Sequence, residues 1–258
     1  MLVDSHCHLD RLDLEPFGGD LDAALAAAAE AGVGHMLCVC IDMDNFPRVR
    51  ELAHAHPQVS ASVGVHPNER DTREPDADEL VKLAADDQVV AIGETGLDYF
   101  RSEGDLDWQR ERFRRHIAAA RAAGKPLIIH MRDATADTLE ILRGERAGEA
   151  GGVMHCFVED WDTARQAMDL GFVISFSGIV TFRNAQALKE VARKVPGDMY
   201  LVETDSPYLA PMPHRGKSNH PAWVRHVAEH IAQLRNTDLD TVAQQTTATY
   251  QRVFGRIS

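Results

Sequence analysis

The chain has 258 residues, of which 44% are hydrophobic and 26% charged, and its formal net charge is −13 at pH 7. This composition is typical of a globular protein, and the length fits a single (β/α)8 barrel, which commonly has roughly 250 residues. No apolar run approaches the ~20 residues that a membrane-spanning helix needs, so we expect no membrane association. The negative charge argues against nucleic-acid binding through the whole surface, although a local cationic patch remains compatible with it.

The four cysteines indicate a reducing compartment. Cys7, Cys38, Cys40 and Cys156 include no Cys-x-x-Cys pair, and all lie near the ends of expected strands. Such cysteines are typical of reduced thiols in intracellular proteins. We therefore expect a cytoplasmic location.

Strands and helices are expected to alternate along the chain. The apolar runs predict strands at 1–3, 35–41, 59–65, 89–93, 127–130, 153–157, 172–177 and 199–203. Helices are expected at 21–31, 45–56, 78–85, 105–123 and 135–143, with two more between 221 and 254. Gly32 suits a position just past a helix end, and Pro47 suits a first helical turn. In 105–123, apolar side chains such as Phe113 and Ile117 recur on one helical face.

Eight strands separated by helices predict a parallel sheet, because parallel neighbours need a crossover connection. We expect this sheet to close into one TIM-type (β/α)8 barrel domain covering 1–258, with additional C-terminal helices. An open doubly wound sheet is the alternative, but it would want a glycine-rich phosphate loop after the first strand. The chain has His6-Cys7-His8 at that position.

Side chains alternate along a strand, so His6 and His8 should share one face and Cys7 should point to the other. Two imidazoles on one face can bind a single metal ion. Taken alone, the pair is equally compatible with two histidines that cap an edge strand.

Further acids and histidines follow the other expected strands. These motifs are Gly64-Val65-His66-Pro67, Gly93-Glu94-Thr95-Gly96-Leu97-Asp98, His130-Met131-Arg132-Asp133, His155-Cys156-Phe157 and Glu203-Thr204-Asp205-Ser206-Pro207. Singly, His130 or His155 is typical of a core histidine, Glu94 of a helix-cap partner and Asp205 of a turn. Because the carboxyl ends of barrel strands meet at one mouth, their joint placement predicts an active site there.

Together with Asp4-Ser5-His6-Cys7-His8-Leu9-Asp10, these motifs resemble the TatD family of metal-dependent hydrolases and deoxyribonucleases in the amidohydrolase superfamily. The resemblance covers nearly the whole chain and extends to Arg215-Gly216-Lys217 and Asn219. One departure is Thr249, where the family usually has asparagine. It lies in an expected terminal helix, so we expect it to affect local packing rather than chemistry.

The resemblance implies two divalent ions, one held by His6, His8 and Asp205 and the other by His130 and His155, with Glu94 bridging the two. Imidazole and carboxylate ligands suit zinc, manganese or magnesium, so the sequence leaves the metal open. Asp205 is the expected general base. His66 is expected to contact the substrate or phosphate, or to act as the acid for the leaving group. Its alternative is a structural histidine before Pro67.

The implied activity is cleavage of DNA phosphodiester bonds by two metals, as a 3′–5′ exonuclease acting on single-stranded or frayed ends. One alternative is the same chemistry on another ester, such as a D-aminoacyl-tRNA or a small phosphoester. A second alternative is a non-catalytic, metal-stabilised binding protein. Nothing in the sequence implies an obligate protein partner.

Five cationic residues follow expected strands and are predicted to contact substrate phosphates: Arg101, Arg132, Arg183, Arg215 and Lys217. By contrast, the run Arg110, Arg112, Arg114 and Arg115 is expected to form a solvated helix face. Cys7 and Cys156 adjoin implied ligands and are expected to pack as small hydrophobes rather than to bind metal.

Overall fold

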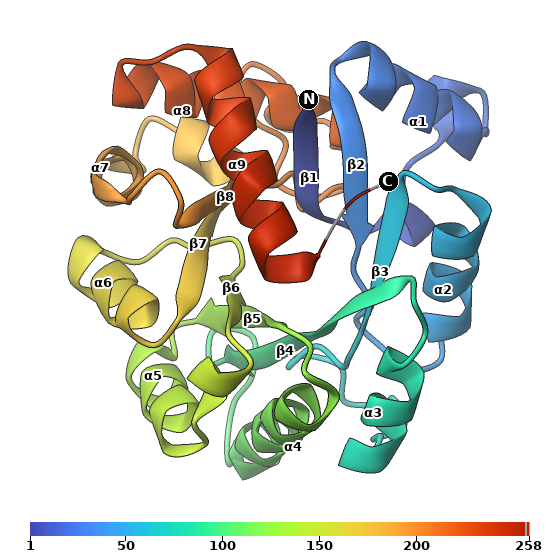
Figure 1. Cartoon of the computed structure of the whole chain (residues 1–258), viewed down its shortest axis with the longest axis vertical. Coiled ribbons are helices and arrows are strands. Elements are labelled where there is room, and N and C mark those ends of the chain that lie inside the picture. Colours follow the sequence, from blue (N-terminus) through green and yellow to red (C-terminus); the bar gives the residue numbers. More distant parts are fainter. Residues whose placement is uncertain (256, 258) are drawn as a thin grey trace. The chain divides into compact units, whose positions relative to one another are not determined.

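Parallel strands and helices alternate along the chain in a computed structural model, which describes all residues except 256 and 258. Within these residues, eight strands follow chain order in one sheet (Figure 1). The strands are β1 Leu2–Cys7, β2 Val33–Cys38, β3 Val59–Val63, β4 Val89–Asp98, β5 Leu127–Arg132, β6 Gly152–Met154, β7 Phe172–Phe176 and β8 Tyr200–Val202. The helices are α1 Leu21–Glu30, α2 Phe46–Ala55, α3 Ala77–Ala84, α4 Asp107–Ala123, α5 Thr135–Gly144, α6 Trp161–Asp169, α7 Gln186–Lys194, α8 Val224–Arg235 and α9 Leu239–Phe254. The predicted TIM-type α/β barrel fold with terminal helices is confirmed.

The contacts divide the chain into two compact units. Unit 1 comprises Met1–Cys38, Cys156–Ala164 and Ile174–Ser258, and unit 2 comprises Val39–His155 and Arg165–Val173. The prediction of one domain over 1–258 stays a prediction. Across the described chain, no helix combines the length and apolar character needed to cross a bilayer. The cytoplasmic location stays a prediction as well.

Unit 1 is organised around β1. This strand pairs in parallel with β2, and a parallel bridge from Cys7 to Ser206 joins its end to the segment that follows β8. Helix α9 packs against both β1 and β8 (Figure 1). In α9, Tyr250 is buried with its ring 5.5 Å from that of His35. The neighbouring Thr249 is also buried, and its hydroxyl has no hydrogen-bond partner among the described residues.

Unit 2 contains the consecutive parallel pairs β3–β4, β4–β5 and β5–β6. Helix α4 packs against β4 through a buried face that includes Phe113 and Ile117, as the helical spacing predicts. The prediction that the arginines of α4 form a solvated face is wrong for Arg112. Arg112 is buried rather than solvated, because its guanidinium forms an ion pair with Glu74 and donates to the carbonyl of His66 over 2.7 Å.

Strand β4 is longer than predicted. It continues past residue 93 to Asp98, because its second half pairs with β5 from Thr95↔Ile129 to Asp98↔Arg132. Gly96 permits this pairing, since its φ is +139° and a Cβ atom there would lie 2.0 Å from the carbonyl oxygen of His130. Glu94 therefore lies inside the strand, and Asp98 is its last residue. Similarly, β5 extends to Arg132, which is a strand residue rather than a loop residue, whereas β6 ends before His155.

A buried histidine in α4 makes unit 2 sensitive to acid. The Nε2 atom of His116 accepts from the backbone N–H of Val65 over 3.0 Å, and Nδ1 lies 2.9 Å from the Arg112 carbonyl. Burial lowers the pKa of His116 to about 4 from its ordinary value of 6.5. Since the unfolded chain takes up this proton first, stability is complete above pH 6.5 and is lost as the pH falls toward 4. The loss attributable to His116 is about 3 kcal/mol in the free energy of unfolding.

We expect His116→Gln to reduce this pH dependence, because glutamine can still pair with the Val65 N–H but does not titrate. Urea unfolding of the wild type and variant at about pH 7.5 and about pH 4.5 measures the difference. An equal loss of stability in both proteins would assign the acid sensitivity to other groups.

Candidate metal centres

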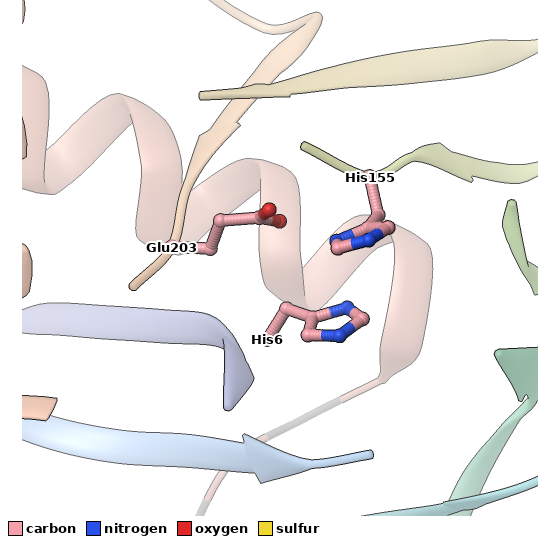
Figure 2. A group of neighbouring side chains, drawn as sticks. All are labelled: His6, His155 and Glu203. Carbon is pink, nitrogen blue, oxygen red and sulfur yellow. The ribbon is translucent and has the colours of Figure 1, made fainter. Parts of the chain in front are cut away.

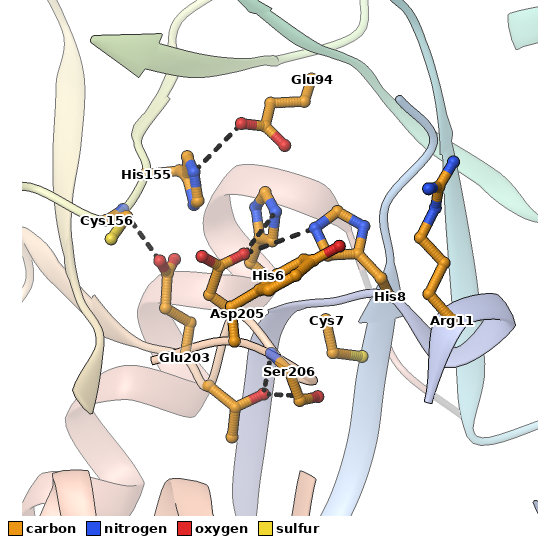
Figure 3. A network of polar contacts seen from close by, with 12 residues as sticks. His6, Cys7, His8, Arg11, Glu94, His155, Cys156, Glu203, Asp205 and Ser206 are labelled. Atoms are coloured by element: carbon orange, nitrogen blue, oxygen red, sulfur yellow. Dashed lines mark hydrogen bonds and ion pairs between the residues drawn. The ribbon is translucent and has the colours of Figure 1, made fainter. Parts of the chain in front are cut away.

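The first cluster of predicted ligands lies in unit 1. Nε2 of His6 is 3.6 Å and Nε2 of His8 is 3.4 Å from the same oxygen, Oδ1 of Asp205 (Figure 3). His6 is in β1, His8 directly follows it, and Asp205 follows β8. The structure thus brings Asp205 next to two histidines that lie about 200 positions earlier in the sequence.

Backbone pairing fixes this cluster. The N–H of Asp205 donates to the carbonyl of His6 over 2.9 Å, and the N–H of His8 donates to the carbonyl of Ser206 over 2.8 Å. Beneath them, Thr204 donates to the buried carboxyl of Asp4 through its backbone N–H at 2.9 Å and its hydroxyl at 2.6 Å. Burial raises the pKa of Asp4 to about 8, although these hydrogen bonds favour the ionised form. The strand that carries the histidines is therefore tied directly to the segment that carries the acid.

The spacing of these three side chains suits a shared ion. Distances of 3.4 and 3.6 Å exceed the usual 2.7–3.2 Å range of an N–H···O hydrogen bond. They are close to the separation of roughly 3.4 Å between two ligands bound tetrahedrally at about 2.1 Å. One carboxylate oxygen and two imidazole nitrogens are also a donor set that zinc and manganese accept. These residues therefore fit a divalent metal ion.

Glu203 is a second acid in unit 1, and it was not among the predicted site residues. Figure 2 shows Glu203, which is fully buried and has an oxygen within 4.8 Å of a ring nitrogen of His6. Its Oε1 accepts from the backbone N–H of Cys156 over 2.8 Å (Figure 3). In the sequence, only its place two residues before Asp205, in Glu203-Thr204-Asp205, connected it with the site.

The second cluster lies in unit 2 around Glu94, which is buried inside β4. Its Oε1 is 3.0 Å from Nδ1 of His130, 3.1 Å from Nε2 of His155 and 3.3 Å from Nε2 of His66. Burial alone would raise the pKa of Glu94, but the surrounding imidazoles hold it well below its usual range. One carboxylate oxygen thus meets three imidazoles that come from β5 and from the segments after β3 and β6.

Asp98 orients one of these rings. Its Oδ2 lies 3.0 Å from Nε2 of His130 and accepts from Nδ2 of Asn68 over 2.8 Å. Burial would raise the pKa of Asp98, but these hydrogen bonds and one from the backbone of Arg101 hold it well below its usual range. An ionised carboxylate requires a donor, so Nε2 of His130 carries a proton. Burial would lower the pKa of His130, but its hydrogen bonds with Asp98 and Glu94 raise it. With Nε2 directed to Asp98, Nδ1 is the ring nitrogen that faces Glu94 and that could bind a metal once its proton is displaced.

His66 has the opposite orientation. Its Nδ1 accepts from the backbone N–H of Asn68 over 3.0 Å, and burial lowers the pKa of His66, which favours the neutral ring. A neutral ring whose Nδ1 is an acceptor carries its proton on Nε2. Nε2 of His66 is therefore a hydrogen-bond donor beside Glu94 and has no lone pair for a metal. The catalytic role of His66 stays a prediction.

The two cysteines beside implied ligands turn away from them. Sγ of Cys7 donates to the carbonyl of Leu37 over 3.4 Å, and burial raises the pKa of this thiol well above its usual range. Sγ of Cys156 lies 3.2 Å from Oγ of Ser177. Both side chains are occupied by packing and local hydrogen bonds, as expected from the sequence.

The predicted phosphate-binding residues are divided between unit 1 and unit 2. In unit 2, Arg132 lies over the exposed ring of Phe100 at 4.0 Å, and the side chain of Arg101 is exposed. In unit 1, Arg183 and Arg215 line one cavity of about 580 Å³, and Lys217 is exposed on the loop that carries Arg215. The structure thus brings Arg183 and Arg215 together.

Residues that sequence reasoning missed are those that position the site: Asp98, Asn68, Arg112 and Glu203. For Asp98, the signal was its place at the end of the Gly-Glu-Thr-Gly-Leu-Asp motif. For Asn68 and Arg112, the sequence contained no signal, because their partners lie on elements distant in the chain.

The fold and the two ligand clusters define a metal-dependent hydrolase. The family model described as TatD related DNase matches residues 3–255, and the chain belongs to this family, within the amidohydrolase superfamily.

Three relatives illustrate the similarity. The "Uncharacterized metal-dependent hydrolase YcfH" of Escherichia coli strain K12 is 52% identical over 254 residues, which cover 98% of this chain and 95% of the relative. The "3'-5' ssDNA/RNA exonuclease TatD" of Edwardsiella piscicida is 31% identical over 245 residues, which cover 92% of this chain and 94% of the relative. The crystal structure of YJJV, a TatD homologue from E. coli K12, matches with a TM-score of 0.89 and 28% identity over 99% of this chain and 98% of that one.

Proposed function

We propose that this metal-dependent hydrolase is a deoxyribonuclease that cleaves phosphodiester bonds of single-stranded or frayed DNA from the 3′ end. The observation that supports this most is the pair of carboxylate oxygens, Asp205 Oδ1 and Glu94 Oε1, each of which faces imidazole nitrogens of predicted ligands. The exonuclease from E. piscicida, a relative over nearly the whole chain, supports the choice of substrate.

We further propose that the residues hold two divalent ions of zinc, manganese or magnesium. His6, His8 and Asp205 would hold one, His130 and His155 the other, and Glu94 would bridge them. Such ions supply Lewis acidity toward phosphoryl oxygens and lower the pKa of water. His66 is left out of the ligand set because its Nε2 carries a proton.

The protein's own groups then move the protons. Asp205 takes a proton from the attacking water as its oxygen bonds to phosphorus. As the phosphorus–oxygen ester bond breaks, Asp205 passes this proton to the leaving oxygen, and Nε2–H of neutral His66 donates a hydrogen bond to that oxygen. Asn68 and Arg112 hold His66 ready for this role through its Nδ1 and its carbonyl.

A panel of substrates tests this proposal. The metal-depleted protein, reloaded with zinc, manganese or magnesium, is assayed on single-stranded DNA, duplex DNA, RNA, D-aminoacyl-tRNA and a chromogenic phosphodiester. We expect the highest kcat/KM on single-stranded DNA, with mononucleotides released from the 3′ end. Preference for the acylated tRNA or the small ester would replace the proposed substrate, and no hydrolysis at all would favour a metal-stabilised binding protein.

Metal removal separates a catalytic ion from a structural one. Prolonged treatment with EDTA should silence the enzyme, and a divalent ion should restore it while the circular dichroism spectrum barely changes. The expected reason is that the ligands lie on a sheet held by its own packing and backbone pairing. Unfolding on metal removal would instead indicate that the ion stabilises the fold.

The loop after β8 should bind the DNA backbone. Arg215 and Lys217 place two positive charges there, so Arg215→Ala combined with Lys217→Ala should weaken DNA cleavage. Loss of two phosphate contacts to a single strand should flatten the slope of log kcat/KM against log salt by about 1.4. Hydrolysis of a small chromogenic phosphodiester should fall much less, because it has no flanking phosphates.

The matched control removes the same charges from the end of α7, as Arg193→Ala combined with Lys194→Ala. Both side chains are exposed on the same unit. If the control flattened the salt slope equally, the effect would come from net charge rather than from this loop. Equal losses on DNA and on the small ester would mean that the loop shapes the catalytic centre.

A further inference from the structure

Most of the large apolar side chains that are exposed follow strands directly in the chain. Among the described residues, the large apolar side chains that are exposed are Met1, Phe100, Val158, Tyr208 and Met212. Apart from Met1, these residues follow β4, β6 and β8. An exposed apolar side chain beside an active site is a candidate for contact with substrate.

Tyr208 makes a ring contact with a predicted metal ligand, His8. It follows Asp205 by three residues, its side chain is 51% exposed, and its ring centroid lies 6.0 Å from that of His8 with the planes at 66°. About half of the side chain is therefore accessible to a ligand, while the T-shaped ring contact with His8 places it beside the cluster of His6, His8 and Asp205.

The backbone holds this ring in place. The N–H of Tyr208 donates to the carbonyl of Asp205 over 2.9 Å, and its carbonyl accepts from Nδ2 of the buried Asn219 over 2.7 Å. The same Asn219 amide donates to the carbonyl of Thr204 over 3.0 Å. By contrast, the Tyr208 hydroxyl has no hydrogen-bond partner within residues 1–255 and 257. The ring is thus presented by a fixed backbone, with about half of the side chain exposed.

The same loop continues into a cationic cavity. Its lining includes Phe182, Arg183, Asn184, Met212 and Arg215, and the Arg215 guanidinium lies over the Phe182 ring at 4.4 Å. The N–H of Met212 donates to Oγ1 of Thr181 over 2.9 Å, which fixes the loop against the segment after β7. An open aromatic ring followed by arginines is the combination that binds single-stranded nucleic acid, where bases stack and phosphates pair with cations.

We propose that Tyr208 stacks on the nucleobase next to the phosphodiester held at His6, His8 and Asp205, and thereby selects unpaired nucleic acid. This inference rests on the proposed nuclease function. A base within a duplex is already stacked on its neighbours, so the ring can engage only a base that has left the helix. The next nucleotide then reaches the cavity that contains Arg183 and Arg215.

Abasic oligonucleotides test this role. Single-stranded DNA carrying one abasic position, moved stepwise from the 3′ end, is compared with intact DNA for the wild type and for Tyr208→Ala, Tyr208→Leu and Tyr208→Phe. At one position, the wild type should lose roughly 5- to 150-fold in kcat/KM, the range that base–aromatic stacking gives. Tyr208→Ala should cleave the two substrates about equally, whereas Tyr208→Phe should keep the discrimination.

Tyr208→Leu separates stacking from apolar bulk. Leucine fills similar space without an aromatic face, so it should behave like alanine; discrimination as strong as that of Tyr208→Phe would overturn the inference. A binding measurement adds a readout independent of turnover. Fluorescence anisotropy of labelled DNA, with the metal-loaded Asp205→Asn variant as background, should show the same loss of base dependence on adding Tyr208→Ala.

The outcomes distinguish this inference from the proposed function. In one outcome, the wild type cleaves DNA as proposed while Tyr208→Ala lowers kcat/KM equally on intact and abasic DNA. That result would overturn the stacking role and leave the proposed nuclease function standing. If the wild type cleaves no nucleic acid, both fall. Cleavage of DNA with no position-specific effect of an abasic site also overturns the inference.

Discussion

Replacing Glu94 by alanine should abolish hydrolysis, with a fall in kcat/KM of at least about 10⁴-fold, because groups that act as a unit fail together. The Oε1 atom of Glu94 meets His130, His155 and His66 within 3.0–3.3 Å. Removing the carboxylate leaves these imidazoles without their common partner and removes a ligand charge. We therefore also expect loss of metal from at least one position.

Elemental analysis by mass spectrometry after gel filtration measures the bound metal, and circular dichroism checks that the fold persists. Glu94→Gln is the informative companion, since the amide occupies the same space but carries no charge. It should retain folding and still lose most turnover. Activity near that of the wild type in Glu94→Ala, on every substrate of the panel, would show that the two-metal assignment is wrong.

Strand number and order were predictable from sequence because buried parallel strands read as apolar runs. The helices were predicted less completely, since α6 Trp161–Asp169 and α7 Gln186–Lys194 were not expected. Strand ends were less predictable. The glycines at 93 and 96 indicate a turn, yet β4 runs through them to Asp98, because β5 approaches so closely that a side chain at Gly96 would collide with His130. Glycine was needed for close packing of backbones, and sequence alone does not separate that role from a turn.

The same limit applies to the site. The motifs at strand ends allowed two ligand sets to be predicted, namely His6, His8 and Asp205, and Glu94, His130 and His155. The prediction was possible because functional groups lie at the carboxyl ends of parallel strands. The sequence did not predict the contacts that determine which ring nitrogens of His66 and His130 carry protons. Asn68 determines the tautomer of His66 through a backbone N–H, and Asp98 determines that of His130, but both depend on the path of the loop after β3 and the true end of β4.

Arg112 shows why charge patterning can mislead. A run of arginines on a helix indicates a solvated face, and Arg110 and Arg114 have partly exposed side chains paired with acids. Arg112 instead lies buried and binds the carbonyls of His66 and Glu69 as well as Glu74. Five donors in one guanidinium can satisfy several buried acceptors at once, and this requirement arises only from the folded loop.

Replacing Asp205 by asparagine should leave at least one metal bound but remove most turnover, by about 10²–10⁴-fold in kcat, the usual contribution of a general base. Asparagine keeps an oxygen that can face His6 and His8, but its amide cannot take the proton from water. The backbone should tolerate the change, because Asp205 has a φ of +56° and asparagine is among the residues that adopt this left-handed region readily. Alanine would be a poorer choice for the same reason.

Asp133 provides the matched control, because it is an aspartate after β5 with a φ of +52° and an exposed side chain. Asp133→Asn makes the same chemical change in the same backbone conformation but outside the ligand clusters, so it should leave kcat nearly unchanged. The measurement is kcat on single-stranded DNA together with metal content for both variants. If Asp205→Asn lost all its metal along with activity, the carboxylate would be needed for binding the ion, and its role as base would have no support. If it kept both metal and full turnover, the proton must go elsewhere, and buried Glu203, whose oxygen lies within 4.8 Å of a ring nitrogen of His6, is the next carboxylate to replace.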